Sequence, residues 1–299
     1  MLLATVWQHV WPRHALAHIT RALCESERPW LKRALIRYFL YHHPVDLHEA
    51  LIGDIDAYPS FNAFFSRVLK PGARPICNSV NSIAAPVDGR VSEFGTLTDT
   101  TLLQAKGQPY TLEALLATAW PRNQHLRNGI YATFYLSPED CHRVYAPLAS
   151  RLLHSTHVPG RLFSVQPRVT QRVPVLYARN ERMICEFDSP FGRYVLVLVG
   201  AGFVSGIVTR WSGLLKRGNS RISSQAYDDS ALHYAKGEEV AHFLMGSTVL
   251  VLLPPRAAHW LGTLATGHSV RFGEAIGQAS GECAPIPVPA ATASNTTII

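Results

Sequence analysis

The hydrophobic pattern of residues 1–70 predicts helices. Apolar side chains recur at helical spacing along residues 7–23. A second helix is expected over residues 30–41, which are both apolar and basic, and a third over residues 60–68, with its phenylalanines facing inward. We therefore expect a helical N-terminal region ending near Pro71-Gly72.

Beyond Pro71-Gly72 the pattern changes to short apolar runs separated by Gly, Pro and Asn turns, which is typical of a β-sandwich or barrel. One helix is expected there, over residues 111–119, with Thr111 as its cap. The expected strands cover residues 89–94, 129–136, 151–158, 183–187, 194–208 and 248–253. The predicted fold class is α+β, with the helical N-terminal region packed on a mainly β, sandwich- or barrel-like core.

Three regions follow from this pattern. They are a helical, membrane-associating region at residues 1–70, a β-rich core at residues 71–278, and a tail at residues 279–299. The tail is rich in Ala, Pro, Ser and Thr and almost free of charge and aromatic residues, so we expect it to be flexible and disordered. No segment reaches the ~20 consecutive apolar residues of a membrane-spanning helix. The amino terminus lacks the positive region of a cleaved signal peptide.

Composition narrows the partners and the compartment. The net charge of +7 over 299 residues favours an anionic partner, such as nucleic acid, acidic lipid or a phosphorylated ligand. The 5 cysteines are scattered without a Cys-x-x-Cys pair, which indicates reduced thiols in a cytosolic compartment and no zinc knuckle.

The basic second helix has two interpretations. It packs on the main domain as an ordinary helix, or it belongs to a surface helix pair that meets a membrane. In the second case Trp and Phe side chains enter the headgroup zone while Lys32, Arg33 and Arg37 meet acidic lipid. Each basic residue near such a surface contributes ~1 kcal/mol.

The first candidate for chemistry is Gly246-Ser247-Thr248, which leads directly into the apolar run of residues 249–253. It is either a tight turn before a buried strand or a self-processing site. In the second interpretation the Ser247 hydroxyl attacks the Gly246 carbonyl, and elimination then leaves a dehydroalanine that hydrolyses to a pyruvoyl group. Glycine suits this chemistry because it has no side chain to obstruct the attack.

Two further stretches of sequence, around Asp88 and around residues 137–145, contain groups that could activate a serine. Asp88 lies in an Asp-Gly turn that is also typical of a plain hairpin. In the second stretch, Ser137, Pro138 and Asp140 predict the start of a helix. Such a helix would place His142 and Tyr145 on one face. A histidine oriented by a carboxylate is the usual base for a serine nucleophile.

Taken in order, several sequence blocks resemble the bacterial phosphatidylserine decarboxylase family, whose proenzymes cleave themselves to make a pyruvoyl cofactor. The resemblance extends to about Gly277. The blocks are Phe61-Asn62-Ala63-Phe64-Phe65, Pro86-Val87-Asp88-Gly89, Leu103-Gln104-Ala105-Lys106-Gly107, residues 110–116, residues 135–143, Val158-Pro159-Gly160-Arg161-Leu162-Phe163-Ser164-Val165, residues 178–182 and Gly246-Ser247-Thr248.

The resemblance implies roles for particular residues. Asp88 matches the carboxylate of the family's processing triad, Ser247 the residue that becomes pyruvoyl, and His142 the histidine implicated in decarboxylation. The family's second histidine, the processing base, is replaced by Tyr145, and a tyrosine of pKa ≈ 10 is a weak base at neutral pH. Either His142 serves both steps, or Tyr145 is activated, or cleavage is slow. We favour the first alternative.

The same resemblance implies the reaction and its setting. Cleavage between Gly246 and Ser247 would give chains 1–246 and 247–299 that stay folded together. The pyruvoyl group at Ser247 would take up the electrons released as phosphatidylserine loses carbon dioxide to become phosphatidylethanolamine. His142, with an ordinary pKa of ~6.5, would return the proton. A homodimer and a peripheral position on the anionic cytoplasmic face of the cell membrane are also implied.

Rival interpretations remain at this point. Because Tyr145 replaces the processing histidine, the chain could be an uncleaved, membrane-binding pseudo-enzyme of the same fold. The 14 histidines prompt a second alternative, a zinc hydrolase of β-rich fold. No His-x-His or His-Glu-x-x-His pair occurs in the sequence, so no metal site is expected. Nucleic-acid binding would account for the charge but not for Asp88, His142 or Ser247, so it is not expected.

Overall fold

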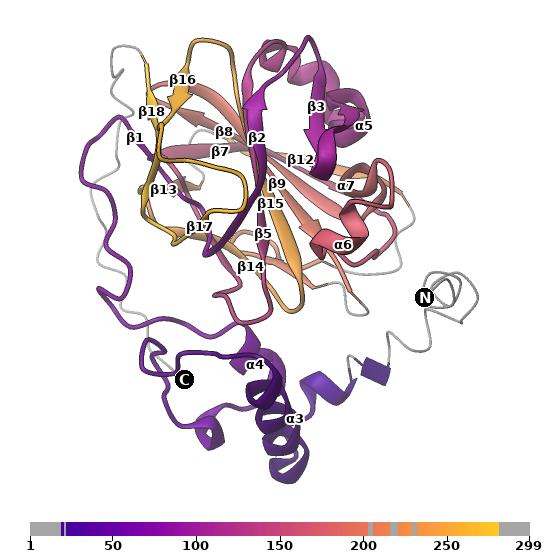
Figure 1. Cartoon of the computed structure of the whole chain (residues 1–299), viewed down its shortest axis with the longest axis vertical. Helices are drawn as coiled ribbons and strands as arrows, with labels where there is room; N and C mark the ends of the chain where they lie inside the picture. Colours follow the sequence, from indigo (N-terminus) through magenta and orange to yellow (C-terminus); the bar gives the residue numbers. More distant parts are fainter. Residues whose placement is uncertain (1–18, 21, 203–205, 216–220, 229–231, 281–299) are drawn as a thin grey trace.

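The computed structural model describes residues 19–20, 22–202, 206–215, 221–228 and 232–280. Most of the first expected helix, residues 7–23, and nearly all of the expected tail lie outside these residues. The predicted α+β class is confirmed: a helical region lies at one end of a body made of antiparallel sheets (Figure 1).

The helical elements are short except for one. They are α3 (Pro29–His42), η1 (Ile55–Ala57), α4 (Phe61–Phe65), η2 (Ala105–Gly107), α5 (Leu112–Leu116), η3 (Ala117–Arg122), η4 (Gln124–Leu126), α6 (Pro167–Thr170) and α7 (Leu176–Arg179), where η marks a 3-10 helix.

Strands make up most of the remaining regular structure. They are β1 (Ser82–Ala84), β2 (Gly89–Thr96), β3 (Thr101–Gln104), β4 (Gln108–Thr111), β5 (Ile130–Leu136), β6 (Arg143–Tyr145), β7 (Ser150–Val158), β8 (Arg182–Ser189), β9 (Gly192–Gly200), β10 (Ile207–Thr209), β11 (Gly213–Leu214), β12 (Ser223–Ala226), β13 (His233–Tyr234), β14 (Glu239–Phe243), β15 (Ser247–Leu253), β16 (Ala258–Trp260), β17 (Ser269–Val270) and β18 (Ala275–Ala279).

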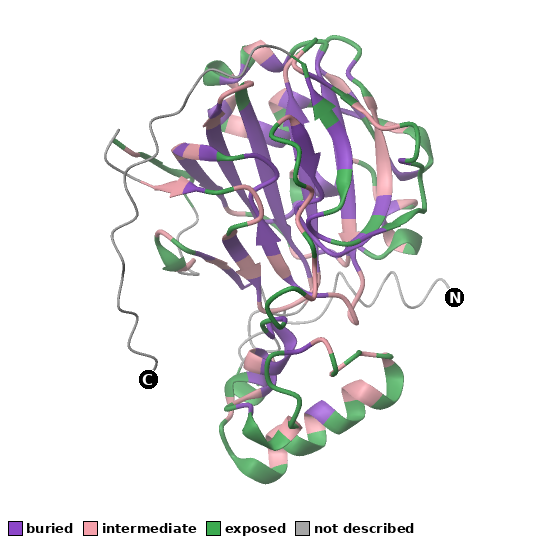
Figure 2. Cartoon of the chain, turned by 90° about the vertical axis from the view of Figure 1, so that its left-hand side faces the viewer, coloured by how far each residue is buried: buried purple, intermediate pink, exposed green. Residues whose placement is uncertain are grey.

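Strand β15 runs through the middle of the largest sheet, whose order is β12-β7-β8-β9-β15-β5-β2-β17. Every residue of β15 is buried, because both faces of the sheet are covered (Figure 2). Its side chains alternate between two cores: Val249, Val251 and Leu253 enter one, and Leu250 and Leu252 enter the other. This explains why the run reads as continuously apolar in the sequence.

Different elements cover the two faces of this sheet. The sheets β11-β10-β14-β6 and β1-β18-β16 pack on one face, and α5, η3 and α7 pack on the other. The expected helix cap is confirmed, since the Thr111 hydroxyl accepts a hydrogen bond of 3.3 Å from the Ala114 N–H. The arrangement is a sandwich with an additional helical layer.

The prediction of one strand over residues 194–208 is wrong. The run contains two strands, β9 and β10, that belong to different sheets. Gly202 adopts a positive φ of 83° between them, a conformation that favours glycine. The apolar composition continues because both strands are buried, so composition alone hides the break. The expected tail also begins slightly too early, because Ala279 pairs with Ala258 in β18.

Phenylalanines hold the helical region together. Phe39 of α3 meets Phe61, Phe64 and Phe65 of α4 edge-on, with ring centroids 5.5, 5.8 and 5.8 Å apart. The third expected helix is therefore confirmed with its phenylalanines inward, although it ends at Phe65. No helix among the described residues has the length and apolar character needed to cross a membrane.

Two of the three basic side chains expected to face lipid are occupied within the protein. Lys32 donates to the carbonyl oxygens of Asp56 and Tyr58, and Arg33 forms an ion pair of 2.6 Å with the Asp56 carboxylate. Lys32 and Arg33 therefore have partners within the protein, in η1 and at the residue after it, and their contact with acidic lipid stays a prediction. Arg37 is exposed on α3.

Candidate active site

Ser247 lies at the start of β15, where the central sheet fixes its backbone. It pairs with Leu136 of β5 on one side and with Gly200 of β9 on the other, and it is fully buried. A Cβ placed on the preceding Gly246 would meet no described atom within 4 Å, and Gly246 does not have a positive φ. Neither packing nor backbone conformation therefore requires glycine at position 246.

The Ser247 hydroxyl faces an imidazole. His142 Nδ1 lies 3.2 Å from Ser247 Oγ, and His142 Nε2 lies 3.1 Å from the Ser137 carbonyl oxygen. A carbonyl oxygen only accepts, so in neutral His142 the Nε2–H donates to Ser137. This leaves the Nδ1 lone pair for the Ser247 hydroxyl proton. The contact has the geometry of a nucleophile and its base.

The expected helix start at Ser137 is wrong. Residues 137–140 form a turn in which Asp140 accepts from the Ser137 N–H (2.6 Å) and donates its own N–H to the Ser137 carbonyl (3.0 Å). The chain then enters β6, whose pairing with β14 requires an extended backbone. Sheet pairing thus overrides the local helix signal, and His142 and Tyr145 do not share a helical face.

His142 lies in a dry environment. It is fully buried, and the Phe65 ring stacks on it with centroids 4.1 Å apart and an interplanar angle of 30°. Burial, followed by the charge of Arg67, lowers the pKa of His142 to about 3. The ordinary value assumed from the sequence therefore does not hold in the uncleaved chain, where His142 is neutral and its Nδ1 can accept a hydrogen bond.

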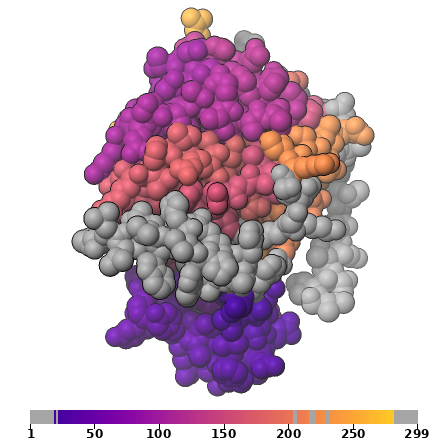
Figure 3. Space-filling model, turned by 90° about the vertical axis from the view of Figure 1, so that its right-hand side faces the viewer, coloured from indigo at the N-terminus to yellow at the C-terminus, as the bar shows by residue number. Residues whose placement is uncertain are grey.

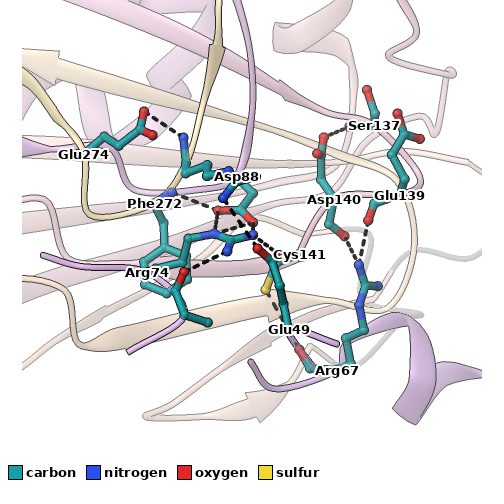
Figure 4. A network of polar contacts seen from close by, with 12 residues as sticks. Glu49, Arg67, Arg74, Asp88, Ser137, Glu139, Asp140, Cys141, Phe272 and Glu274 are labelled. Atoms are coloured by element: carbon teal, nitrogen blue, oxygen red, sulfur yellow. Dashed lines mark hydrogen bonds and ion pairs between the residues drawn. The ribbon is translucent and has the colours of Figure 1, made fainter. Parts of the chain in front are cut away.

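Asp88 is buried but forms no hydrogen bond with His142 or Ser247. Arg74 donates to both Asp88 oxygens, with a shortest distance of 2.9 Å, and the Phe272 N–H donates to Oδ1 at 2.8 Å (Figure 4). Arg74 also pairs with Glu49 at 2.7 Å. The structure brings together His142 and Ser247 of the expected set, and it holds Asp88 in a neighbouring ion-pair network.

Tyr145 packs beside this network. Its ring stacks on Phe272 with centroids 3.7 Å apart and an interplanar angle of 13°. Burial raises the pKa of Tyr145 far above its ordinary value. A phenol that resists ionisation is a poor base at neutral pH, so burial disfavours the alternative of an activated Tyr145.

Sequence reasoning missed three contributors to this site. The Ser137 carbonyl sets the tautomer of His142, Phe65 stacks on its ring, and Arg67 lowers its pKa. Phe65 was identified only as a core residue, and a backbone carbonyl leaves no trace in the sequence. No group of three His, Cys, Asp or Glu side chains suited to a metal ion occurs among the described residues.

A buried serine that follows a glycine and lies within hydrogen-bond distance of a neutral histidine is the arrangement expected of a self-processing proenzyme. Comparisons with known proteins agree with this class. Residues 61–278 match the family model described as phosphatidylserine decarboxylase, and residues 3–43 match a second one described as PSD.

Curated relatives are similar along most of their length. Three are named phosphatidylserine decarboxylase proenzyme. The protein of Methylococcus capsulatus is 42% identical over 90% of this chain and 94% of its own. The protein of Xanthomonas euvesicatoria is 45% identical over 92% of this chain and 99% of its own. The protein of Pseudomonas fluorescens is 41% identical over 90% of this chain and 95% of its own. The chain belongs to the phosphatidylserine decarboxylase family.

The geometry predicts different effects of changing His142 and Tyr145. His142→Gln removes the acceptor for the Ser247 proton, so self-cleavage should slow by about 10²-fold or more. Tyr145→Phe removes a hydroxyl with no part in proton transfer, so cleavage should stay within about twofold of wild type. Denaturing gels of freshly made protein would measure both rates. Blocked cleavage in Tyr145→Phe, with normal cleavage in His142→Gln, would reverse this assignment.

The pKa of His142 predicts a flat pH profile for self-cleavage. Because this pKa is depressed to about 3, the imidazole stays neutral from pH 8 to pH 5, and the rate should show no inflection near 6.5. Burial raises the pKa of the neighbouring Asp140 to about 6, so this carboxyl group titrates in the same pH range. Asp140→Asn removes that titration and serves as the control. An inflection near 6.5 that persists in Asp140→Asn would contradict the account.

Proposed function

We propose that this protein decarboxylates phosphatidylserine to phosphatidylethanolamine with a pyruvoyl group that it makes from its own Ser247. Family membership supports the reaction. The observation that carries the proposal for the site is the 3.2 Å contact between His142 Nδ1 and Ser247 Oγ, with Gly246 directly before it.

Self-cleavage begins with His142. Its Nδ1 takes the hydroxyl proton, and Ser247 Oγ forms a bond to the Gly246 carbonyl carbon. The carbon–nitrogen bond then breaks, the nitrogen takes up a proton, and an ester remains. Loss of the Ser247 α-proton with cleavage of the Cβ–O bond releases chain 1–246 with a terminal carboxylate. The dehydroalanine at position 247 takes up water and releases ammonia, which leaves a pyruvoyl group.

The surroundings of Ser247 fit this group. The position is enclosed, has an acceptor beside it, and lies at the end of a strand whose pairing does not depend on residue 246. When formed, the group supplies a carbonyl that takes up the electron pair released with carbon dioxide. His142, adjacent to this position, then holds a proton at Nδ1 and returns it to the substrate carbon.

Asp88 contributes to the proposed site from a greater distance. Its carboxylate fixes Arg74 and the Phe272 backbone, and Phe272 in turn stacks on Tyr145. We propose that Asp88 acts by holding this wall of the site, while His142 is the base in cleavage and the acid that returns the proton in decarboxylation. The substitution of Tyr145 for a histidine then leaves the chemistry intact, which disfavours the pseudo-enzyme alternative.

The fold supports two chains that remain associated after cleavage. Strand β15, the start of the small chain, pairs with β5 from Ser247 to Leu253 and with β9 from Ser247 to Leu252. Breaking the peptide bond before Ser247 leaves the pairs from Thr248 onward intact, and only residue 247 loses its backbone nitrogen. Chains 1–246 and 247–299 should therefore copurify and separate only in denaturant.

The helical region is the proposed membrane contact. Most of the exposed large apolar side chains of the described residues belong to it, and Figure 3 shows this region at one end of the molecule. They are Ile19, Leu23, Trp30, Tyr38, Tyr41, Leu51, Ile52 and Val68. With the net charge of +7, this surface suits peripheral binding to the anionic cytoplasmic face of the membrane. The family resemblance adds the proposal of a homodimer.

Carbon dioxide release tests the function. Purified wild-type protein should release carbon dioxide from phosphatidylserine in mixed micelles and form phosphatidylethanolamine. Ser247→Ala should abolish release, because neither the ester nor the pyruvoyl group can form. Ser269→Ala, which changes an exposed serine on β17, is the matched control and should retain activity. Equal release by Ser247→Ala and wild type would refute the proposal.

A further inference from the structure

Buried guanidinium groups surround the proposed site, and they differ in their partners. Arg74 pairs with Glu49 and Asp88, and Arg143 pairs with Glu239. Arg67 forms no ion pair with any described carboxylate, although only 4% of it is exposed. It is therefore a buried cation on which the carboxylates of Asp88 and Asp140 act only from beyond ion-pair distance.

The hydrogen bonds of Arg67 are also incomplete. Nη2 donates to the carbonyl oxygens of Glu139 (2.6 Å) and Asp140 (3.3 Å), as Figure 4 shows. Nε and Nη1 are buried and have no partner among the described residues. Folded proteins seldom leave buried donors unpaired, because each one costs free energy of desolvation. A fold that keeps two such donors on a buried charge is suited to an anionic ligand.

Arg67 lies alongside the segment that carries His142. Its own carbonyl oxygen accepts from Arg143 Nε at 3.2 Å, and its guanidinium reaches the carbonyls of residues 139 and 140. Phe65, two residues earlier, stacks on the His142 ring. The unpaired donors are therefore close to the position where the substrate would react.

We propose that Arg67 binds the phosphodiester of the lipid headgroup through Nε and Nη1, an assignment that rests on the proposed function. In phosphatidylserine the amine nitrogen, two carbons, an ester oxygen and phosphorus follow one another. An amine held at position 247 therefore brings the phosphate within a few bond lengths, and its charge requires a nearby cation. An arginine fork matches two phosphate oxygens.

The chemistry favours the phosphodiester over the substrate carboxylate. The carboxylate loses its charge as carbon dioxide departs, so a guanidinium bound to it would stabilise the substrate more than the transition state. The phosphodiester keeps its charge throughout the reaction. Cleavage separates Met245, which packs against the cluster that contains Phe61, Phe64 and Phe65, from residue 247, and we expect the freed end to open a path to Arg67.

Three soluble amines can show which of the two substrate anions Arg67 binds. Each is tested as an inhibitor of the cleaved protein while it decarboxylates short-chain phosphatidylserine. Ethanolamine carries neither anion, glycerophosphoethanolamine adds the phosphodiester, and serine adds the carboxylate. Wild type should bind glycerophosphoethanolamine about tenfold to a hundredfold more tightly than ethanolamine. Arg67→Gln should abolish this preference, and Arg67→Lys should reduce it in part. Neither variant should change the ratio of the affinity for serine to the affinity for ethanolamine.

Arg127→Gln is the matched control, because it removes an exposed arginine paired with Asp99 and should leave both ratios unchanged. A wild-type protein without preference for glycerophosphoethanolamine would overturn the proposal, and so would an unchanged preference in either Arg67 variant. If the Arg67 variants instead lose the preference for serine over ethanolamine, Arg67 binds the carboxylate, and this result would also overturn the proposal. The proposed function fails separately, if wild type releases no carbon dioxide. Thermal stabilisation by the same three ligands would then still report on Arg67.

Discussion

The hydrogen bond between Ser247 and His142 depends on how three backbone segments are held. β15 fixes Ser247 through pairing on both sides, the Ser137–Asp140 turn presents the carbonyl that receives His142 Nε2–H, and β6 begins directly after His142. Each segment is anchored by sheet pairing or by a closed turn. The donor and acceptor therefore meet without depending on long, mobile side chains.

Exclusion of water is the second condition, and the helical region contributes to it. Phe65 covers the His142 ring, and Arg143 Nε ties the catalytic segment to the carbonyls of Ser66 and Arg67. The dry environment keeps His142 neutral, so its lone pair is available at physiological pH. The region proposed to meet the membrane is thus also part of the site's wall, which joins membrane contact and chemistry in one short stretch of chain.

The sequence was informative where the signal was periodic or the motif specific. Strand β15, the phenylalanines of α4 and the Thr111 cap were predictable from pattern alone. Resemblance identified Asp88, His142 and Ser247 as site residues but assigned His142 to decarboxylation, and the contact between His142 and Ser247 became visible only in the structure. The turn at residues 137–140 was mistaken for a helix start, because the same capping residues satisfy a turn when a strand follows. The ion pairing of Asp88 with Arg74, and the unpaired donors of Arg67, arise from contacts between distant segments that no local pattern records.

A denaturing mass spectrum of the purified wild-type protein tests the central claim most directly. The account predicts two polypeptides, one ending at Gly246 and the other beginning at position 247 with a pyruvoyl group in place of a free amine. A single intact polypeptide of 33.1 kDa in protein that decarboxylates phosphatidylserine would contradict it.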